Sequence, residues 1–221
     1  MELSSKHLPR VNTNVRIIHA NPTSSNVDIY ANGSLLTSNI SFGKISKYIT
    51  LTPGEYEFQL YLTGTYDKPI LTQTLELIAN TNYTISFVTL SNNLFLFKLR
   101  DDNVPIQKTQ AFLRFINLSN NSPLLSLSLP NNSVLFNSVE YLETTSYYPL
   151  SSGIYNFKVL VGTSQLTAKY IKNITLDGGK FYTIYIIGVF ACKPIMGYLF
   201  VDDLISVSYT HLRAHETGAY L

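Results

Sequence analysis

Apolar and polar residues alternate along most of this chain of 221 residues, and the period of the alternation is two. In residues 55–62, Tyr, Phe, Leu and Leu alternate with Glu, Glu, Gln and Tyr, and residues 71–77 follow the same pattern. Successive side chains of a strand point to opposite faces, so this pattern predicts strands with one buried face. No window shows the period, length and caps that are typical of a helix.

Short alternating runs separated by turn residues predict about seven strands in each half of the chain. The predicted strands of the first half are residues 14–20, 26–31, 45–51, 55–62, 70–78, 82–90 and 93–100. Those of the second half are residues 111–117, 124–129, 144–150, 154–161, 167–176, 181–190 and 195–201. Asn32-Gly33, Pro53-Gly54 and Gly178-Gly179 provide the positive φ that tight turns between strands require.

The two halves are copies of one unit, because shifting the chain by about 99 residues superimposes matching residues. The superimposed pairs are Tyr48 with Tyr147, Gly54 with Gly153, Tyr56 with Tyr155, Phe58 with Phe157 and Tyr83 with Tyr182. Near the starts of the units the shift is 98, which places Arg16 on Arg114. Near the ends it is 101, which places Asp101-Asp102 on Asp202-Asp203. Tyr83 and Tyr182 each open a strand after a polar turn, where a buried hydroxyl often bonds back across the corner.

These patterns predict an all-β protein of two tandem immunoglobulin-like or transthyretin-like antiparallel β-sandwich domains. The expected organisation, from the first residue to the last, is an N-terminal extension over 1–13, domain 1 over 14–102, a linker over 103–109, a diverged domain 2 over 110–203 and a tail over 204–221. The tail breaks the composition of the repeat, and we expect it to be non-native or disordered.

Two of the predicted strands are apolar on both faces. Phe181–Ile187 and Leu94–Phe97 lack the polar face that a strand at the surface of a sandwich needs. The second face must therefore be covered. The other unit of the same chain, a partner protein or another copy of the chain could each cover it.

Composition narrows the functional classes. Hydrophobic residues make up 45% of the chain, and the net charge of +2 with a pI near 8.5 is too mild to indicate nucleic-acid binding. No apolar run approaches the roughly 20 residues that span a bilayer, and the start lacks the apolar segment of a signal peptide. We therefore expect synthesis in the cytoplasm, with assembly onto a cell or spore surface left open. The single cysteine, Cys192, excludes an internal disulfide framework, and we expect it to be buried and inert.

Candidate chemistry is sparse. His19 and Asp28 could form an acid–base pair if their strands are neighbours. The acidic pairs that end the two units could offer oxygen ligands to Ca²⁺, but solvated strand ends are the simpler interpretation. His211 and His215 have the spacing of two metal ligands on one helix face, but they lie in the tail. We expect no catalytic residue, no metal site and no cofactor.

Ordered motifs in the first unit resemble a bacterial family known as domain of unknown function 4397. They are Val15 to Pro22, Val27 to Gly33, Phe42-Gly43, Pro53 to Tyr56 and Tyr83-Thr84. The second unit resembles the family more weakly, with Asn117 at the position of His19 and Leu125 to Leu127 around that of Asp28. The resemblance implies a β-sandwich module, often in tandem, in envelope or secreted proteins of bacteria, with no known catalysis.

Three hypotheses of function follow. The first is a non-enzymatic tandem β-sandwich module with a structural or adhesive role at a bacterial cell or spore surface, whose partners would be proteins, envelope glycans or further copies of itself. The second is a carbohydrate-binding module, which predicts two or three exposed tyrosines on one sheet. The third is a hydrolase that uses His19 and Asp28. A sandwich fold alone cannot choose among them.

Overall fold

The structure is a computed structural model, and it describes residues 11–101, 108–162 and 166–203. The strands of the first half are β1 (Thr13–His19), β2 (Val27–Ala31), β3 (Ser34–Ile40), β4 (Ile49–Leu51), β5 (Gly54–Leu62), β6 (Leu71–Leu77), β7 (Asn82–Leu90) and β8 (Asn93–Asp101). Those of the second half are β9 (Gln110–Asn117), β10 (Leu125–Ser128), β11 (Val134–Val139), β12 (Tyr148–Ser151), β13 (Gly153–Val161), β14 (Leu166–Leu176), β15 (Phe181–Ile187) and β16 (Gly197–Asp202).

The strands form two tandem β-sandwich domains, as the alternation predicted. Domain 1 (β1–β8) has the sheets β4-β1-β7-β8 and β3-β2-β5-β6, and domain 2 (β9–β16) has the sheets β12-β9-β15-β16 and β11-β10-β13-β14. Each domain has its own apolar core, in which Phe58 and Phe157 occupy matching, fully buried positions. The pairing is antiparallel except between β1 and β7 and between β9 and β15, which are parallel.

Each domain has eight strands instead of the seven predicted. The unpredicted strands, β3 and β11, lie at the edges of their sheets, and most of their residues are not buried. An edge strand in a sandwich needs few apolar residues, so its alternation is weak. The strand predicted over residues 45–51 is shorter than expected, because only Ile49–Leu51 pairs continuously with β1 and residue 45 makes an isolated bridge.

The turns and the tyrosine corners agree with the sequence. Asn32 and Gly33 have φ values of 47° and 75° and close the β2–β3 hairpin. The hydroxyl of Tyr83 accepts a hydrogen bond from the Ile78 amide at 3.2 Å, and that of Tyr182 accepts one from the Asp177 amide at 3.1 Å. Both tyrosines therefore tie the start of a strand to the preceding turn.

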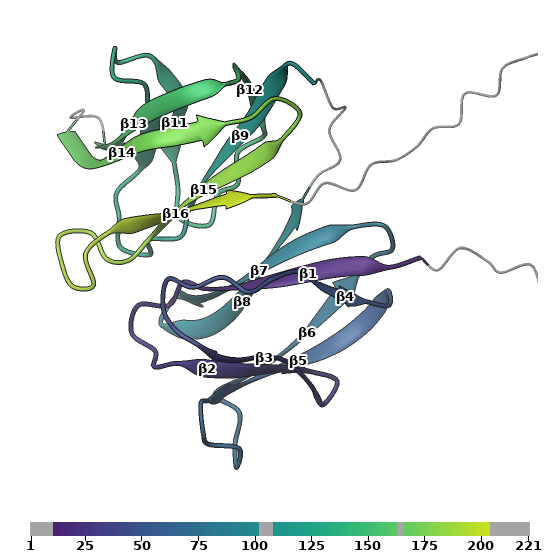
Figure 1. Ribbon diagram of the computed structural model, residues 1–221. Coiled ribbons are helices and arrows are strands. Elements are labelled where there is room, and N and C mark those ends of the chain that lie inside the picture. The colour runs from purple at the N-terminus through teal and green to yellow at the C-terminus, as the bar shows by residue number, and fades with distance from the viewer. Residues whose placement is uncertain (1–10, 102–107, 163–165, 204–221) are drawn as a thin grey trace, which may run out of the picture.

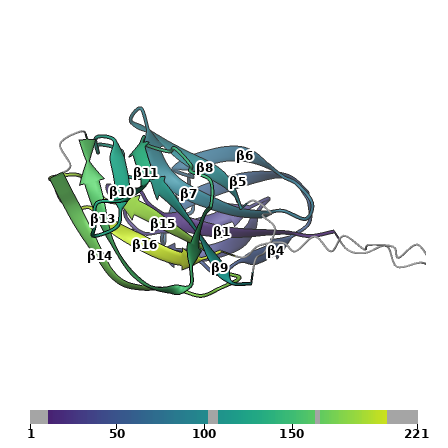
Figure 2. The ribbon, with the colours of Figure 1, turned by 90° about the horizontal axis from the view of Figure 1, so that it is seen from above.

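The two domains pack through their inner sheets, β4-β1-β7-β8 and β12-β9-β15-β16. Figure 1 shows β15 and β16 facing β1 and β7, and in Figure 2, seen from above, β15 and β16 overlie β1. A third apolar cluster joins the two domains, with Ile18 and Val88 of domain 1 buried with Tyr185 and Ile187 of domain 2. The strands that are apolar on both faces are thus covered by the other unit of the same chain.

Parts of the predicted organisation lie outside the described residues. They are residues 1–10 of the N-terminal extension, residues 102–107 at the domain end and linker, and the tail from residue 204, which includes His211 and His215. None of the described segments forms a helix with the length and hydropathy that a membrane span requires.

Candidate functional site

The domain interface contains two buried arginines at equivalent positions. Arg16 lies in β1 and Arg114 in β9, and only 2% and 1% of their surfaces are exposed. Their neighbours in sequence, such as Ile17 and Phe115, point into the cores. Alternation along the strand therefore directs both guanidinium groups away from the cores and toward the interface.

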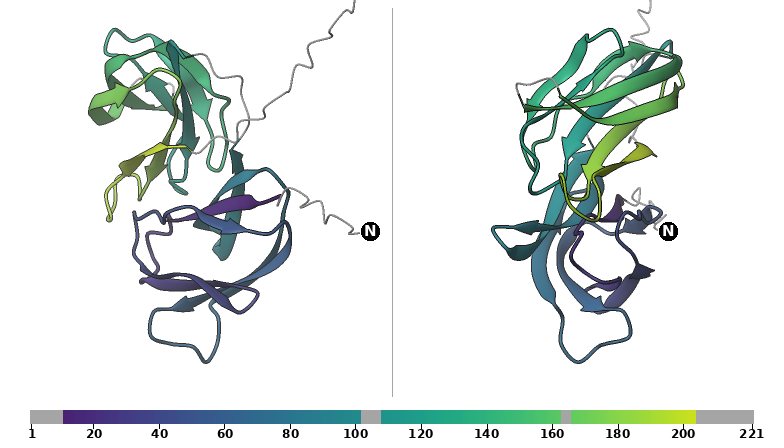
Figure 3. Two further views of the ribbon diagram at one scale, coloured as in Figure 1. Left: turned by 45° about the vertical axis from the view of Figure 1, so that its right-hand side comes forward. Right: turned by 90° about the vertical axis from the view of Figure 1, so that its left-hand side faces the viewer.

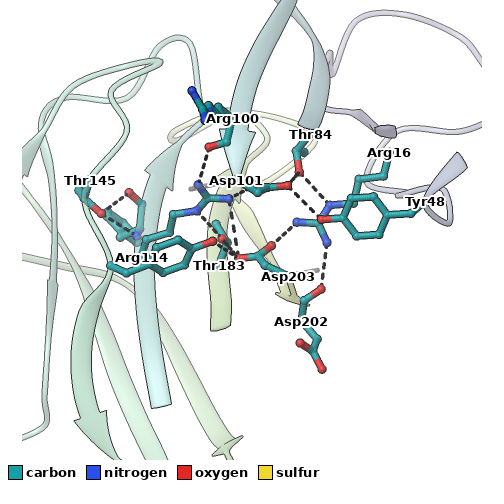
Figure 4. Close-up of polar contacts among 12 residues, drawn as sticks. Arg16, Tyr48, Thr84, Arg100, Asp101, Arg114, Thr145, Thr183, Asp202 and Asp203 are labelled. Carbon is teal, nitrogen blue, oxygen red and sulfur yellow. Dashed lines mark hydrogen bonds and ion pairs between the residues drawn. The ribbon is translucent and has the colours of Figure 1, made fainter. Parts of the chain in front are cut away.

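Each arginine binds the aspartate of the other domain (Figure 4). The Nη2 group of Arg16 donates to Oδ1 of Asp203, and that of Arg114 donates to Oδ1 of Asp101. Arg114 Nη2 also lies 3.7 Å from Oδ2 of Asp203. Each arginine donates as well to a main-chain oxygen across the interface, Arg16 to that of Asp202 at 3.0 Å and Arg114 to that of Arg100 at 3.3 Å.

Hydroxyl groups complete the coordination of both carboxylates within each domain. In domain 1, Tyr48 and Thr84 donate to Oδ2 of Asp101 at 3.0 Å and 3.2 Å. In domain 2, Tyr147 donates to Oδ2 of Asp203 at 2.9 Å, and Thr183 donates to the same oxygen. The same threonines accept from the arginine Nε groups of their own domains, at 2.8 Å for Thr84 and 2.7 Å for Thr183.

The contacts make Asp203 the counterpart of Asp101, which corrects the sequence alignment. The predicted shift of 101 residues matched Asp101 with Asp202. The strand register instead pairs Tyr182 with Asp202 and Tyr83 with Arg100, which gives a shift of 102. The loop from β15 to β16 is longer than the β7–β8 turn, and loop lengths cannot be fixed by a few matched residues.

The tyrosines and arginines of the interface keep the charge states that these contacts need. Burial and the neighbouring Asp101 raise the pKa of Tyr48, and burial and Asp203 raise that of Tyr147, so both phenols stay protonated donors. Burial opposes the charge of Arg114, but the neighbouring carboxylates of Asp203 and Asp101 outweigh it and raise the pKa above its usual value. We call four of these charged residues the interdomain cluster: Arg16, Arg114, Asp101 and Asp203.

The interdomain cluster corrects the interpretation of Asp101 and Asp203 as solvated strand ends. Asp202 is exposed, as predicted, and Asp102 lies outside the described residues. Asp101 and Asp203 are 2% and 5% exposed, and their oxygens are occupied by arginine, tyrosine and threonine donors. In the part of the chain that the structure describes, no group of three or more His, Cys, Asp and Glu residues is placed to hold a metal ion. The pairing of Arg16 and Arg114 with these aspartates was not predicted from the sequence, although the repeat aligned the two arginines.

His19 and Asp28 do not form the pair considered from the sequence. Their strands lie in different sheets, because β1 pairs with β4 and β7 whereas β2 pairs with β3 and β5. His19 is fully buried, and its ring centroid lies 5.0 Å from that of Phe87. Its Nε2 lies 3.0 Å from the carbonyl oxygen of Ser25. Since that oxygen can only accept, the neutral ring carries its proton on Nε2.

Asp28 instead holds three segments of domain 1 together. Its Oδ1 accepts from the Asn39 amide at 2.6 Å and from the Thr63 hydroxyl at 2.9 Å, and its Oδ2 accepts from the Tyr66 hydroxyl at 2.8 Å. Burial alone raises the pKa of Asp28, but these donors outweigh it and lower the pKa below its usual value. The carboxylate therefore stays ionised and orders the loop from β5 to β6.

His19 and Asp28 both form hydrogen bonds to residues that line two adjoining cavities. A cavity of about 560 Å³ is lined by Ser25, Asn26, Asn39, Leu62, Thr63 and Thr65. A second cavity of about 310 Å³ shares Ser25 and Leu62 with the first. His19 binds the main chain of Ser25, and Asp28 binds Asn39 and Thr63. We call the two cavities together the loop groove, because they lie between the β1–β2 and β5–β6 loops.

We predict that His19 makes the stability of domain 1 sensitive to mild acid. Burial lowers the pKa of His19, so the unfolded chain binds a proton more readily than the folded chain once the pH falls below the ordinary histidine value. The free energy of unfolding should then decrease as the pH falls from about 7.5 to about 5.5, by at most about 1.4 kcal/mol per pH unit. Urea denaturation across this range measures the slope.

The matched variant is His19→Gln, whose amide can still donate to Ser25. The difference between the two pH curves isolates His19, because other histidines contribute equally to both. The variant should have the flatter curve. Parallel curves for the wild type and the variant would contradict the prediction, because they would show that His19 has the same pKa in the folded and the unfolded chain.

Cys192 is exposed, which contradicts the prediction of a buried thiol. The apolar strand β15 ends at Ile187, so Cys192 lies in the loop that follows instead of in the strand. The apolar sequence up to residue 191 led to the wrong expectation, because the last residues of the run extend beyond the sheet.

A family model described as a domain of unknown function (DUF4397) matches residues 13–128 and, a second time, residues 128–213. The two matches meet within β10, whereas the sheets of domain 1 end with β8 at Asp101 and those of domain 2 begin with β9 at Gln110. No curated protein matches the chain.

Proposed function

We propose that this chain, which belongs to the DUF4397 family and carries two copies of its domain, is a non-enzymatic module with a structural or adhesive role at a bacterial cell or spore surface. The observation that carries the proposal is the interdomain cluster, in which each domain neutralises the buried carboxylate of the other. Removing one member of the cluster would leave a buried charge without its partner, so the four residues fit together only when the two domains are packed in this arrangement.

The apolar contact between the domains also stabilises their packing against each other. Ile18 and Val88 pack with Tyr185 and Ile187, and the hydroxyl of Tyr141 in domain 2 donates to the Thr89 carbonyl in domain 1 at 2.6 Å. Burial raises the pKa of Tyr141 to about 12, so this donor persists at neutral and mildly alkaline pH. Two domains with a fixed relative orientation suit a spacer, or a protein that must hold its binding surface in place against a partner.

The outer sheets remain open for contacts with a partner. In Figure 1 the sheets β3-β2-β5-β6 and β11-β10-β13-β14 lie on the sides of the two domains that face away from the interface. Only 14% of the residues in the chain are charged, and its many Asn, Ser, Thr and Tyr residues can form polar contacts without long-range charge attraction. This composition favours adhesion through many weak polar contacts.

Cosedimentation tests the surface role directly. The purified chain is mixed with isolated bacterial cell envelopes and with intact spores, and the bound fraction is compared with that of an unrelated soluble protein of similar size and charge. We expect the chain to sediment with at least one of the two materials, in a manner that added soluble envelope material suppresses. Recovery in the supernatant with both materials would contradict the proposal.

A carbohydrate-binding module is the second candidate, and the tyrosines of domain 1 favour it. Tyr30, Tyr61 and Tyr66 cluster with ring centroids 5.6 to 6.3 Å apart, and 57% of the Tyr66 surface is exposed. The expected row of exposed tyrosines on one sheet is not present as such, because Tyr30 and Tyr61 lie on one sheet but are half-buried, and the exposed Tyr66 lies in the β5–β6 loop. The hydrolase alternative has less support, because His19 and Asp28 have separate hydrogen-bond partners.

A further inference from the structure

We propose that the loop groove and the adjoining tyrosines of domain 1 bind a neutral oligosaccharide. The inference rests on the adhesive form of the proposed function and names its ligand class. The site lies between the β1–β2 loop and the β5–β6 loop, and Figure 3 shows the β5–β6 loop protruding from domain 1 on the side away from domain 2. Domain 2 therefore does not cover this loop.

The lining of the groove matches the chemistry of sugar hydroxyl groups. In the larger cavity, every lining residue except Leu62 has a hydroxyl or a carboxamide side chain, and none is charged. Hydroxyls and carboxamides both donate and accept, as the hydroxyl groups of a sugar do. A charged ligand would meet no counter-charge in this lining, whereas a neutral polyhydroxylated one can satisfy each group.

An unsatisfied donor lies in the wall of the smaller cavity. Asn21 lines that cavity and is 1% exposed. Its Oδ1 accepts from the amide and the hydroxyl of Thr23, at 3.0 Å and 2.9 Å, but its Nδ2 has no hydrogen-bond partner among the described residues. Leaving a buried donor unpaired costs free energy, and a ligand oxygen in the cavity would recover it.

The tyrosines provide an apolar surface beside the polar lining. The Tyr66 hydroxyl donates to Asp28, which also accepts from the lining residues Asn39 and Thr63. The Tyr61 ring lies next to that of Tyr66, with a centroid distance of 6.0 Å. Aromatic rings present a large apolar face at small entropic cost, and the C–H faces of sugar rings pack on such surfaces. The combination of rings and hydroxyl groups therefore complements both faces of a saccharide.

The site is ordered before any ligand arrives. Asp28 accepts hydrogen bonds from Thr63 and Tyr66, which fixes the β5–β6 loop, and His19 fixes Ser25 in the β1–β2 loop. Asn26 Nδ2 also donates to Oδ1 of Asn39 at 2.7 Å. A site with fixed walls loses little conformational entropy on binding. His19 and Asp28 are thus positioning residues for the groove.

Domain 2 lacks this combination and serves as an internal comparison. The strand registers place Ser126, Ser128 and Leu160 at the positions of Asp28, Tyr30 and Tyr61. Neither the carboxylate that fixes the loop nor these two rings are present there. Domain 2 nevertheless has an exposed tyrosine, Tyr170, whose 60% exposure is close to that of Tyr66.

Titration calorimetry and saturation-transfer NMR with the full chain test the inference. The probes are short neutral oligosaccharides of glucose, galactose, mannose and N-acetylglucosamine, with neutral peptides of similar size as the competing class. We expect one oligosaccharide series to bind, and Tyr66→Ala to weaken that binding about tenfold or more. The matched control, Tyr170→Ala, should bind as the wild type does. Asn26→Ala should also weaken binding, whereas its effect on stability should be small because its side chain is exposed.

The outcomes separate the site from the surface role. If no oligosaccharide binds, if peptides bind instead, or if Tyr66→Ala and Tyr170→Ala bind equally well, the groove inference is wrong. If Tyr66→Ala still sediments with envelopes as the wild type does, the groove is not the adhesive site but the surface role stands. If the wild type binds an oligosaccharide through Tyr66 and yet sediments with neither envelopes nor spores, the groove inference stands and the surface role fails.

Discussion

Replacing Arg114 with methionine should destabilise the protein by about 3–5 kcal/mol, the cost of leaving a buried carboxylate without its cation. Arg114 donates to Asp101 and lies 3.7 Å from Asp203, so its loss affects both carboxylates. Arg16→Met should cost less, because Asp203 keeps Arg114 nearby. Urea denaturation of the two variants and the wild type measures the difference.

Two further variants control this experiment. Lys172→Met removes an exposed cation from β14 and should change the free energy of unfolding by less than about 0.5 kcal/mol. Arg114→Met combined with Asp101→Leu removes both charges of the pair, and should recover part of the lost stability. If Arg114→Met is no more harmful than Lys172→Met, the interdomain cluster does not hold the domains together.

The second large effect concerns the two cores. Phe58→Ala in domain 1 and Phe157→Ala in domain 2 each remove a fully buried ring, and each should cost about 3–5 kcal/mol. Because the domains share an apolar cluster and exchanged ion pairs, we expect each substitution to loosen both domains. Hydrogen exchange followed by mass spectrometry reports the opening of each domain separately.

The expected result is faster exchange of the most protected amides in both domains for either variant. Tyr170→Ala, which removes an exposed ring, should leave exchange unchanged. Faster exchange confined to the mutated domain would show that the domains unfold independently. In that case the tandem would be two linked units instead of one cooperative body.

Local pattern predicted much of the fold. Alternation in β5 and β6 and the turn at Asn32-Gly33 are determined by neighbouring residues, so the sequence alone identified them. The edge strands β3 and β11 bury few side chains, and their sequences therefore lack a clear period. The parallel pairing of β1 with β7 joins residues 68 positions apart, such as Asn14 and Asn82, and no local pattern encodes it.

The residues of the interdomain cluster could have been identified from the sequence, but they were not. Arg16 and Arg114 are charged residues with apolar neighbours on both sides in their strands, and the repeat aligned them with each other. A charge at such a position needs a buried counter-charge, and the repeated aspartates were available. The sequence did not indicate that the partner lies in the other domain, because exchange between the domains depends on how the sheets pack.

The exchange of arginines between the domains has a consequence for concentration. Each domain presents an arginine and an aspartate, and receives the same two groups from the other in return, which is the geometry of a self-complementary dimer. Covalent linkage makes this association intramolecular, with an effective concentration set by the short connection. Dilution that would dissociate two separate chains therefore leaves this pairing intact.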